Sequence, residues 1–178
     1  MRSMREPFGL LMTVIGLVAL FVVLTGCQDQ ETSQLRDQQL LEAKNKEFIQ
    51  SYTEDFWNTH NIEAFDKYYA ADFVVHFANG DQNREQAKGL YQAYFAAFPD
   101  LHITTDDLVA EGDKVTKVWT AKCTHTGEFM GIPATNNKLA VKGIEVFRLA
   151  DGKIAELWAS MDNLGMMQQL GVIPPLGE

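Results

Sequence analysis

Residues 141–160 read VKGIEVFRL, then ADGK, then IAELWAS, so two β-rich runs flank a short polar turn. The dipeptide Asp151-Gly152 is a strong hairpin signal, because glycine accepts the positive φ that such turns require. Alternate positions of a strand face opposite sides of its sheet, and here both sets are largely apolar. The run 141–149 therefore predicts a strand in the middle of a sheet that is covered on both faces. One carboxylate, Glu145, stands among its apolar positions, and it is the first candidate for chemistry.

The rest of the chain predicts helices first and strands afterwards. Apolar side chains recur at helical spacing over residues 35–60,. Further helices are expected over residues 62–70, 84–98 and 163–170, and further strands over residues 72–77, 101–110 and 114–126. This order favours an α+β fold in which three N-terminal helices wrap a curved antiparallel sheet. Such a sheet leaves a concave, mostly apolar cavity, the usual place for a small-molecule site.

The N-terminus has the pattern of an export signal. Two arginines precede an uncharged apolar run over residues 8–24, and Leu24-Thr25-Gly26-Cys27 follows. A basic region, an apolar region and small residues before a cleavage point are typical of secretory signals. The last four residues resemble a bacterial lipobox, which would make Cys27 the lipid-modified first residue of the mature protein. The alternative is an uncleaved signal-anchor helix, but spanning usually takes about 20 apolar residues and this run is shorter.

The predicted organisation is therefore a signal peptide over residues 1–26, a lipid anchor and polar tether over residues 27–37, and one domain over residues 38–178. The domain is expected outside the cytoplasm, in the cell envelope, held to a bacterial membrane through Cys27. Gln28 stands where an aspartate would indicate inner-membrane retention, so the outer membrane is preferred where two membranes exist. Cys123 is the one other cysteine, which leaves no intrachain disulfide once Cys27 is acylated, and Cys123 is expected to pack as a small hydrophobe.

Charge excludes one class of partner. The whole chain has 15 basic and 24 acidic side chains and a formal net charge of −9. Removal of residues 1–26 takes away two arginines and one glutamate, which leaves 13 basic and 23 acidic side chains, a formal charge of −10. Such a surface repels phosphate backbones, and no basic stripe alternates with aromatic residues. No nucleic-acid partner is expected.

A series of short motifs resembles one family. The motifs are AFPDL at 97–101, AEGDKV at 110–115, THTGEFMGIP at 124–133, IEVFR at 144–148, DGKI at 151–154, Trp158 and QQLG at 168–171. Their order and spacing resemble SnoaL-like proteins over roughly residues 44–171. The resemblance implies the nuclear-transport-factor-2-like cone, a bent antiparallel sheet wrapped by three helices around a pocket. The family is named for a polyketide cyclase, and many relatives are labelled ester cyclases on similarity alone.

The resemblance also implies a chemistry. The studied cyclases close a carbocycle by an intramolecular aldol reaction, with an aspartate as general acid/base and with neither metal nor cofactor. Carried across the motif frame, that aspartate falls on Ala159, which cannot transfer a proton. The histidine that the cyclases place in the preceding strand falls on Glu145. The fold is therefore expected to carry over, whereas the known mechanism does not carry over residue by residue.

Four residues are candidates for acid/base chemistry. Glu145 could be a relocated general base with a pKa raised by an apolar pocket, or it could be paired across strands with Lys142 or Lys122. His125, before the long connection, and His76, at the end of an earlier strand, suit proton transfer near neutral pH. Each histidine could instead bond to backbone at the end of the sheet.

Asp162 is the fourth candidate, and its position before residues 163–170 favours a helix N-cap over catalysis. The histidines and carboxylates have no tight spacing, so no metal site is expected. No cofactor is expected either. Five further residues are expected to bind substrate: Trp119, Phe129, Trp158, Tyr69 and Met161. Alternation alone does not settle which way the strand residues among them point, because a bulge would exchange the faces.

Three functions remain open. The first is an exported lipoprotein that binds a small, largely apolar molecule and performs cofactor-free acid/base chemistry on a carbonyl compound, as cyclase, isomerase or hydrolase. The second is a non-catalytic lipoprotein that uses the same pocket to hold a ligand, which the alanine at position 159 favours. The third is a homodimeric assembly element that pairs through the outer face of the sheet.

Overall fold

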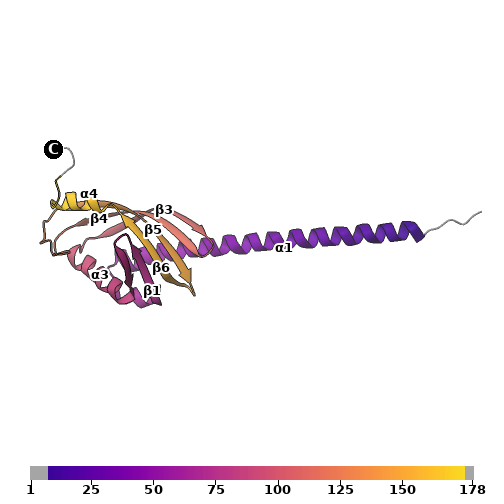
Figure 1. Cartoon of the computed structure of the whole chain (residues 1–178), viewed down its shortest axis with the longest axis horizontal. Coiled ribbons are helices and arrows are strands. Elements are labelled where there is room, and N and C mark those ends of the chain that lie inside the picture. The colour runs from indigo at the N-terminus through magenta and orange to yellow at the C-terminus, as the bar shows by residue number, and fades with distance from the viewer. Residues whose placement is uncertain (1–7, 175–178) are drawn as a thin grey trace, which may run out of the picture. The chain divides into compact units, whose positions relative to one another are not determined.

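The computed structural model describes residues 8–174, with side chains from residue 30 onward. The chain divides into residues 1–40 and residues 41–178. The first unit consists of the larger part of helix α1 (Phe8–Tyr52) (Figure 1). Among residues 30–174, whose side chains are described, no helix is both long enough and apolar enough to cross a membrane. Residues 28–34, expected as a tether, continue the helical backbone of α1.

The second unit is built on one six-stranded sheet in the order β2-β1-β6-β5-β4-β3. The strands are β1 (Tyr69–Phe77), β2 (Gly80–Asn83), β3 (His102–Glu111), β4 (Lys114–Thr124), β5 (Lys138–Ala150) and β6 (Lys153–Met161). All neighbouring strands are antiparallel except β1 and β6, which run parallel. The predicted α+β fold with a curved sheet is confirmed, and the parallel pair is the one departure from the expected antiparallel pairing. β5 lies inside the sheet as expected, but the prediction that both its faces are covered is wrong, because its buried positions alternate with exposed ones such as Ile144. The short polar strand β2 lacks the β-rich composition that would have revealed it.

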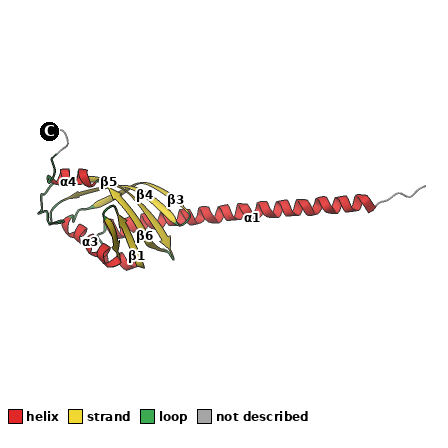
Figure 2. Cartoon of the chain, in the orientation of Figure 1, coloured by secondary structure: helices red, strands yellow, loops and turns green. Residues whose placement is uncertain are grey.

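The helices are shorter and more varied than the periodicity predicted. After α1, a π-helical turn (Thr53–Asn58) ends near His60, a non-glycine residue with positive φ. The predicted helix over residues 62–70 is a 3-10 turn (Ile62–Ala64) followed by α2 (Phe65–Tyr68), and Tyr69 already begins β1. Figure 2 shows these helices and α3 (Arg84–Ala97) on one side of the sheet.

Side-chain hydrogen bonds fix the start of α3 and the position of the last helix. Asn83 begins α3 with a capping box, in which its side chain accepts from the backbone N–H of Gln86 and the Gln86 side chain accepts from the backbone N–H of Asn83. The last helix, α4 (Asn163–Leu170), lies against the start of β5. There the Gln169 amide bonds both the N–H and the C=O of Ala140, at 2.7 and 3.1 Å. α4 is thereby held beside the end of β5 that will form the upper wall of the cavity.

A bulge in the β5–β6 hairpin decides which side chains face the helices. Leu149 pairs with Ile154, whereas Arg148 pairs with Glu156, so Ala155 is an extra residue in β6. Without it, Glu145 would stand opposite Trp158. With it, Glu145 stands opposite Ala159 on the concave face, and Trp158 points to the convex face. One inserted residue exchanges the two faces of the rest of a strand, and here it places a small side chain beside the carboxylate.

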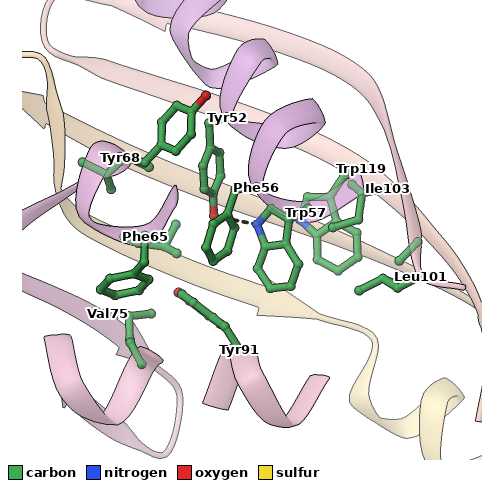
Figure 3. Close-up of a cluster of buried hydrophobic side chains, with 14 of the residues drawn as sticks. Tyr52, Phe56, Trp57, Phe65, Tyr68, Val75, Tyr91, Leu101, Ile103 and Trp119 are labelled. Carbon is green, nitrogen blue, oxygen red and sulfur yellow. Dashed lines mark hydrogen bonds between the residues drawn. The ribbon is translucent and has the colours of Figure 1, made fainter. Parts of the chain in front are cut away.

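The dry core fills the closed end of the concave face. Tyr52 packs edge-on against Phe147 of β5, with 5.8 Å between ring centroids, and Phe56 packs against Phe65 and Tyr69. Figure 3 shows Tyr52, Phe56 and Trp57 side by side in this cluster, with Phe65 next to them. Aromatic side chains bury much apolar area each and pair edge to face. This end of the concave face therefore holds no room for a ligand.

Candidate functional site

A cavity of about 980 Å³ lies above the aromatic core on the concave face of the sheet. Its wall is mostly apolar and includes Trp57, Tyr94, Phe98, Trp119, Val141 and Met166. The boundary also takes in residues that point to the convex face, Ile144 and Trp158 among them, so part of the volume lies outside the concave face. A partly enclosed apolar volume of this size is within the range of small-molecule sites.

The strand register divides the concave face into layers. Lys117, Glu145 and Ala159 form one layer across β4, β5 and β6. The next layer toward α4 holds Trp119, Gly143 and Met161. Above it lie Ala121 and Val141, and below the carboxylate lie Val115, Phe147 and Leu157 of the core. Glu145 therefore stands at the floor of the cavity, where the aromatic core ends.

Gly143 keeps the second layer open. A Cβ at this position would come within 2.3 and 2.6 Å of two indole carbons of Trp119, closer than such atoms approach. The Trp119 indole therefore lies flat against the β5 backbone in space that only glycine leaves free. The indole therefore forms part of the cavity wall one layer above Glu145.

Glu145 is held in a buried ion pair. Its Oε2 lies 2.8 Å from Nζ of Lys117, and the two side chains are 11% and 1% exposed. The angle of approach is not that of a hydrogen bond, so Oε2 has no hydrogen-bond partner within the described residues. The Lys117 ammonium also donates to Thr53 Oγ1 at 3.4 Å and lies 5.3 Å from the Phe147 ring and 5.6 Å from the Tyr52 ring. The charges of Glu145 and Lys117 thus compensate each other, and the aromatic faces also stabilise the lysine ammonium,.

A short chain of polar groups lies beneath this pair. The Trp57 Nε1–H donates to the Tyr52 hydroxyl at 2.6 Å, and the Tyr52 and Tyr69 hydroxyls are 2.5 Å apart (Figure 3). Burial raises the pKa of Tyr52 well above its ordinary value, and the interactions with Tyr91 and Glu145 raise it further. Either hydroxyl of the Tyr52–Tyr69 pair can be the donor. Tyr69 therefore supports the floor from below and does not line the cavity.

His76 and Trp158 meet on the convex face. Their rings stack with 4.8 Å between centroids, and the two imidazole nitrogens lie 2.9 Å from Asp81 and 3.2 Å from Glu156. Arg148 in turn binds Glu156 at 2.5 Å. The hydrogen bond with Asp81 raises the pKa of His76 despite partial burial, and the bond with Glu156 adds to the rise. This arrangement holds the β1–β2 hairpin to β6 on the side away from Glu145.

His125, Phe129 and Asp162 occupy structural positions outside the cavity wall. His125 is fully buried in the connection after β4, where Nδ1 accepts from the backbone N–H of Thr135 and the ring packs on Phe98. Phe129 packs between Tyr94 and Phe98. Asp162 caps α4 by accepting from the backbone N–H of Gly165 at 2.8 Å, which was the structural role expected from its position.

The structure thus brings together three of the residues singled out from the sequence, Glu145, Trp119 and Met161, on one concave wall. It adds two that were not singled out, Lys117 and Tyr94. The alternation Val115, Lys117, Trp119 gives a signal for Lys117, since one cation lies on an otherwise apolar face. Cys27 falls in α1 among residues whose side chains are not described. Within the described part of the chain, no group of three His, Cys, Asp or Glu residues is placed to hold a metal ion.

The curved sheet, its covering helices and the apolar cavity between them define the nuclear-transport-factor-2-like class. Within that class, the model of the SnoaL-like polyketide cyclase family matches residues 47–170. The chain belongs to this family, as the motif order predicted. Among curated proteins, no significant match to the chain is found.

Solved structures agree with this assignment. IdmH, a candidate polyketide cyclase from Streptomyces antibioticus, is 33% identical with a TM-score of 0.62, over 72% of this chain and 99% of IdmH. A candidate polyketide cyclase from Acidithiobacillus ferrooxidans is 31% identical with a TM-score of 0.65, over 72% of this chain and 94% of that one. AclR, a candidate hydroxylase from Streptomyces galilaeus, is 26% identical with a TM-score of 0.71, over 77% of this chain and 87% of AclR. Proteins described with different activities therefore share this fold.

The ion pair makes a prediction about stability. Lys117→Met should lower the free energy of unfolding by about 3–5 kcal/mol, because it leaves the Glu145 carboxylate buried and uncompensated. Adding Glu145→Gln should restore much of the loss. Denaturant unfolding measures both changes, with Lys122→Met, an exposed position of the same strand, as the control. Equal stability of Lys117→Met and the unchanged protein would show that the pair does not form.

The His76 cluster makes a prediction about pH. Because the folded pKa of His76 is raised from 6.5, its contribution is fully present below pH 6.5 and is lost as pH rises through the folded pKa. Denaturant unfolding between about pH 6 and pH 8 should therefore show a fall in stability, below about 1 kcal/mol for so exposed a group. His76→Gln should remove this component, and His102→Gln, an exposed histidine of β3, should keep it. A pH slope unchanged by His76→Gln would contradict the assignment.

Proposed function

We propose that this chain is an exported, lipid-anchored SnoaL-like protein that binds a small, largely apolar molecule and performs cofactor-free acid/base chemistry on a carbonyl compound. One observation carries the proposal: the carboxylate of Glu145, 8% exposed as a residue, lies at the floor of the apolar cavity on the concave face. A carboxylate in such a place is costly to bury unless it is paired or used. Glu145 is paired on one side and borders the cavity on the other.

The apolar residues of the cavity wall are evidence for an apolar ligand. Trp119, Val141 and Met166 come from two strands and a helix, and each presents apolar atoms to the same volume. Burial of apolar surface contributes roughly 25 cal/mol for each Å² removed from water. A molecule that fills the cavity would gain most of its affinity in this way, and few polar groups would remain to orient it.

The position of Glu145 supports the chemistry. It stands directly opposite Ala159, the position to which the resemblance assigns the aspartate of the studied cyclases. Side chains opposite each other in an antiparallel pair have Cβ atoms about 5 Å apart, and glutamate is one methylene longer than aspartate. The carboxylate can therefore reach the same part of the cavity from the neighbouring strand. There it would accept a proton from the carbon beside a carbonyl group and return it.

The relatives support the same substrate class. IdmH and the Acidithiobacillus ferrooxidans protein are each described as a candidate polyketide cyclase, and cyclisation of that kind begins with removal of a proton beside a carbonyl. The description of AclR as a candidate hydroxylase leaves the final product of the reaction open. The proposal for this chain is therefore limited to the proton transfer and to an apolar substrate.

A non-catalytic binding protein is the second candidate. The contact of Glu145 with Lys117 favours it, because the ion pair by itself accounts for a buried carboxylate at this position,. The homodimer proposal has less support, since the convex face is not wholly apolar: Lys142, Arg148 and Glu156 lie on it together with Ile144, Val146 and Trp158.

Proton exchange distinguishes catalysis from binding. With 2-nonanone in D₂O, the protein should speed deuteration beside the carbonyl, and Glu145→Gln should lower that rate by about 10²–10⁴-fold. Mass spectrometry of the recovered ketone measures the rate, and Glu128→Gln, an exposed position of the long connection, is the control. Ketone binding without exchange would favour the non-catalytic candidate. An equal rate in Glu145→Gln would rule out this residue as the base.

Lipid attachment has a separate test. Expression of the full chain in a Gram-negative host with an alkyne-labelled fatty acid should label the protein, and Cys27→Ser should abolish the label while Cys123→Ser retains it. The reason is that Cys27 alone follows the lipobox-like residues 24–26. Membrane fractionation of the same cells should place the labelled protein with the envelope. Labelling that survives Cys27→Ser would contradict the anchor.

A further inference from the structure

Tyr94 is a polar group of the cavity wall whose hydroxyl is weakly bonded. It lies on α3, borders the cavity, and donates to the sulfur of Met161 at 3.9 Å. That sulfur is the one acceptor that its hydroxyl has within the described residues. A thioether is a poor acceptor, and a hydroxyl in an apolar cavity gains when a better one replaces it. Tyr94 is therefore poised to donate to an oxygen atom of a ligand.

The layers of the sheet bring this hydroxyl near Glu145. Its partner Met161 belongs to the layer directly above the one that holds Glu145 and Ala159. Two residues along a strand correspond to about 7 Å. A carbonyl oxygen and the carbon next to its carbonyl group are two bonds apart, so one ligand can meet both residues at hydrogen-bonding and near-attack distances of about 3 Å.

A raised pKa keeps the Tyr94 hydroxyl protonated, so it can donate a hydrogen bond. Burial raises its pKa to about 12, and the negative charge of Glu145 contributes to that rise. The phenol consequently stays protonated near neutral pH. Its ring is also held in place, with centroids 4.7 Å from Phe129 and 6.1 Å from Phe98. Met161, by contrast, has a flexible side chain that can give way to a ligand.

We propose that Tyr94 is a catalytic residue whose hydroxyl donates a hydrogen bond to the carbonyl oxygen of the ligand while Glu145 takes a proton from the adjacent carbon. The electron pair of the broken C–H bond forms a C=C bond, and the C=O π pair moves onto the oxygen that Tyr94 holds. Return of the proton from Glu145 to carbon reverses the step, so no other reactant is needed. This inference rests on the proposed function and narrows its substrate class to carbonyl compounds with a hydrogen on the carbon next to the carbonyl group.

The test compares two probes of the same shape. 2-Nonanone carries the carbonyl oxygen, and 2-methyl-1-nonene has a methylene group in its place. The full-length protein, in detergent, should bind the ketone about fivefold more tightly, the value of one net hydrogen bond of about 1 kcal/mol. Tyr94→Phe should abolish this preference and lower ketone deuteration by about 10²–10³-fold, as loss of one oxyanion donor does.

Two further variants sharpen the comparison. Tyr68→Phe makes the same chemical change at a hydroxyl that bonds Asp55 outside the cavity, and it should keep both the preference and the exchange rate. Met161→Leu removes the competing sulfur without removing the phenol, and it should widen the preference for the ketone. Intrinsic fluorescence titration and exchange measured by mass spectrometry give the two readouts.

The outcomes separate this inference from the proposed function. Equal binding of ketone and alkene by the unchanged protein would overturn the role of Tyr94 and leave apolar binding in place. A preference that survives Tyr94→Phe would also overturn it. Failure of both probes to bind would overturn the proposed function and the inference together. Loss of the preference in Tyr94→Phe alone supports the inference.

Discussion

The buried ion pair between Lys117 and Glu145 is the constraint on which the rest of the concave face depends. Neither charge could remain in this position alone, since an uncompensated ion in an apolar interior is strongly destabilising. The two residues are placed opposite each other by the β4–β5 register, so the longest ladder of the sheet must keep that register. Below the pair, Tyr52 and Phe147 offer aromatic faces to the ammonium. Above it, the carboxylate borders open space. The pair therefore marks where the core stops and the cavity starts.

Two small residues leave space at the boundary between the core and the cavity. Gly143 admits the Trp119 indole against the strand backbone, and Ala159 leaves room next to the carboxylate on the β6 side. The second effect depends on the extra residue Ala155, because the bulge assigns Ala159 rather than Trp158 to the concave face. A bulge is a local change, but it moves every later side chain of the strand to the opposite face of the sheet. The shape of the floor is thus a consequence of hairpin geometry as much as of side-chain size.

Local patterns predicted most of the fold, and long-range register accounts for what they missed. The Asp151-Gly152 turn and the apolar runs beside it located β5 and β6, while the capping signals located the start of α4. No local signal marks β2, which is four polar residues, or the parallel pairing of β1 with β6. Alternation placed Glu145 on a mostly apolar face. It could not name Lys117 as its partner, because the long connection over residues 125–137 hides the register between β4 and β5.

A carboxylate at position 145, rather than at position 159, has a lysine directly opposite it on the neighbouring strand. At position 159, an acidic side chain would be on β6, with β1 on its far side. At position 145, it lies in the same layer on β5, between β6 and β4, and directly opposite Lys117 of β4. A charge in that layer needs a counter-charge that costs the cavity no space, and Lys117 supplies it from the neighbouring strand, with its ammonium over two aromatic rings. The same arrangement requires an uncharged residue at position 159, because a carboxylate there would lie directly opposite Glu145 and repel it,.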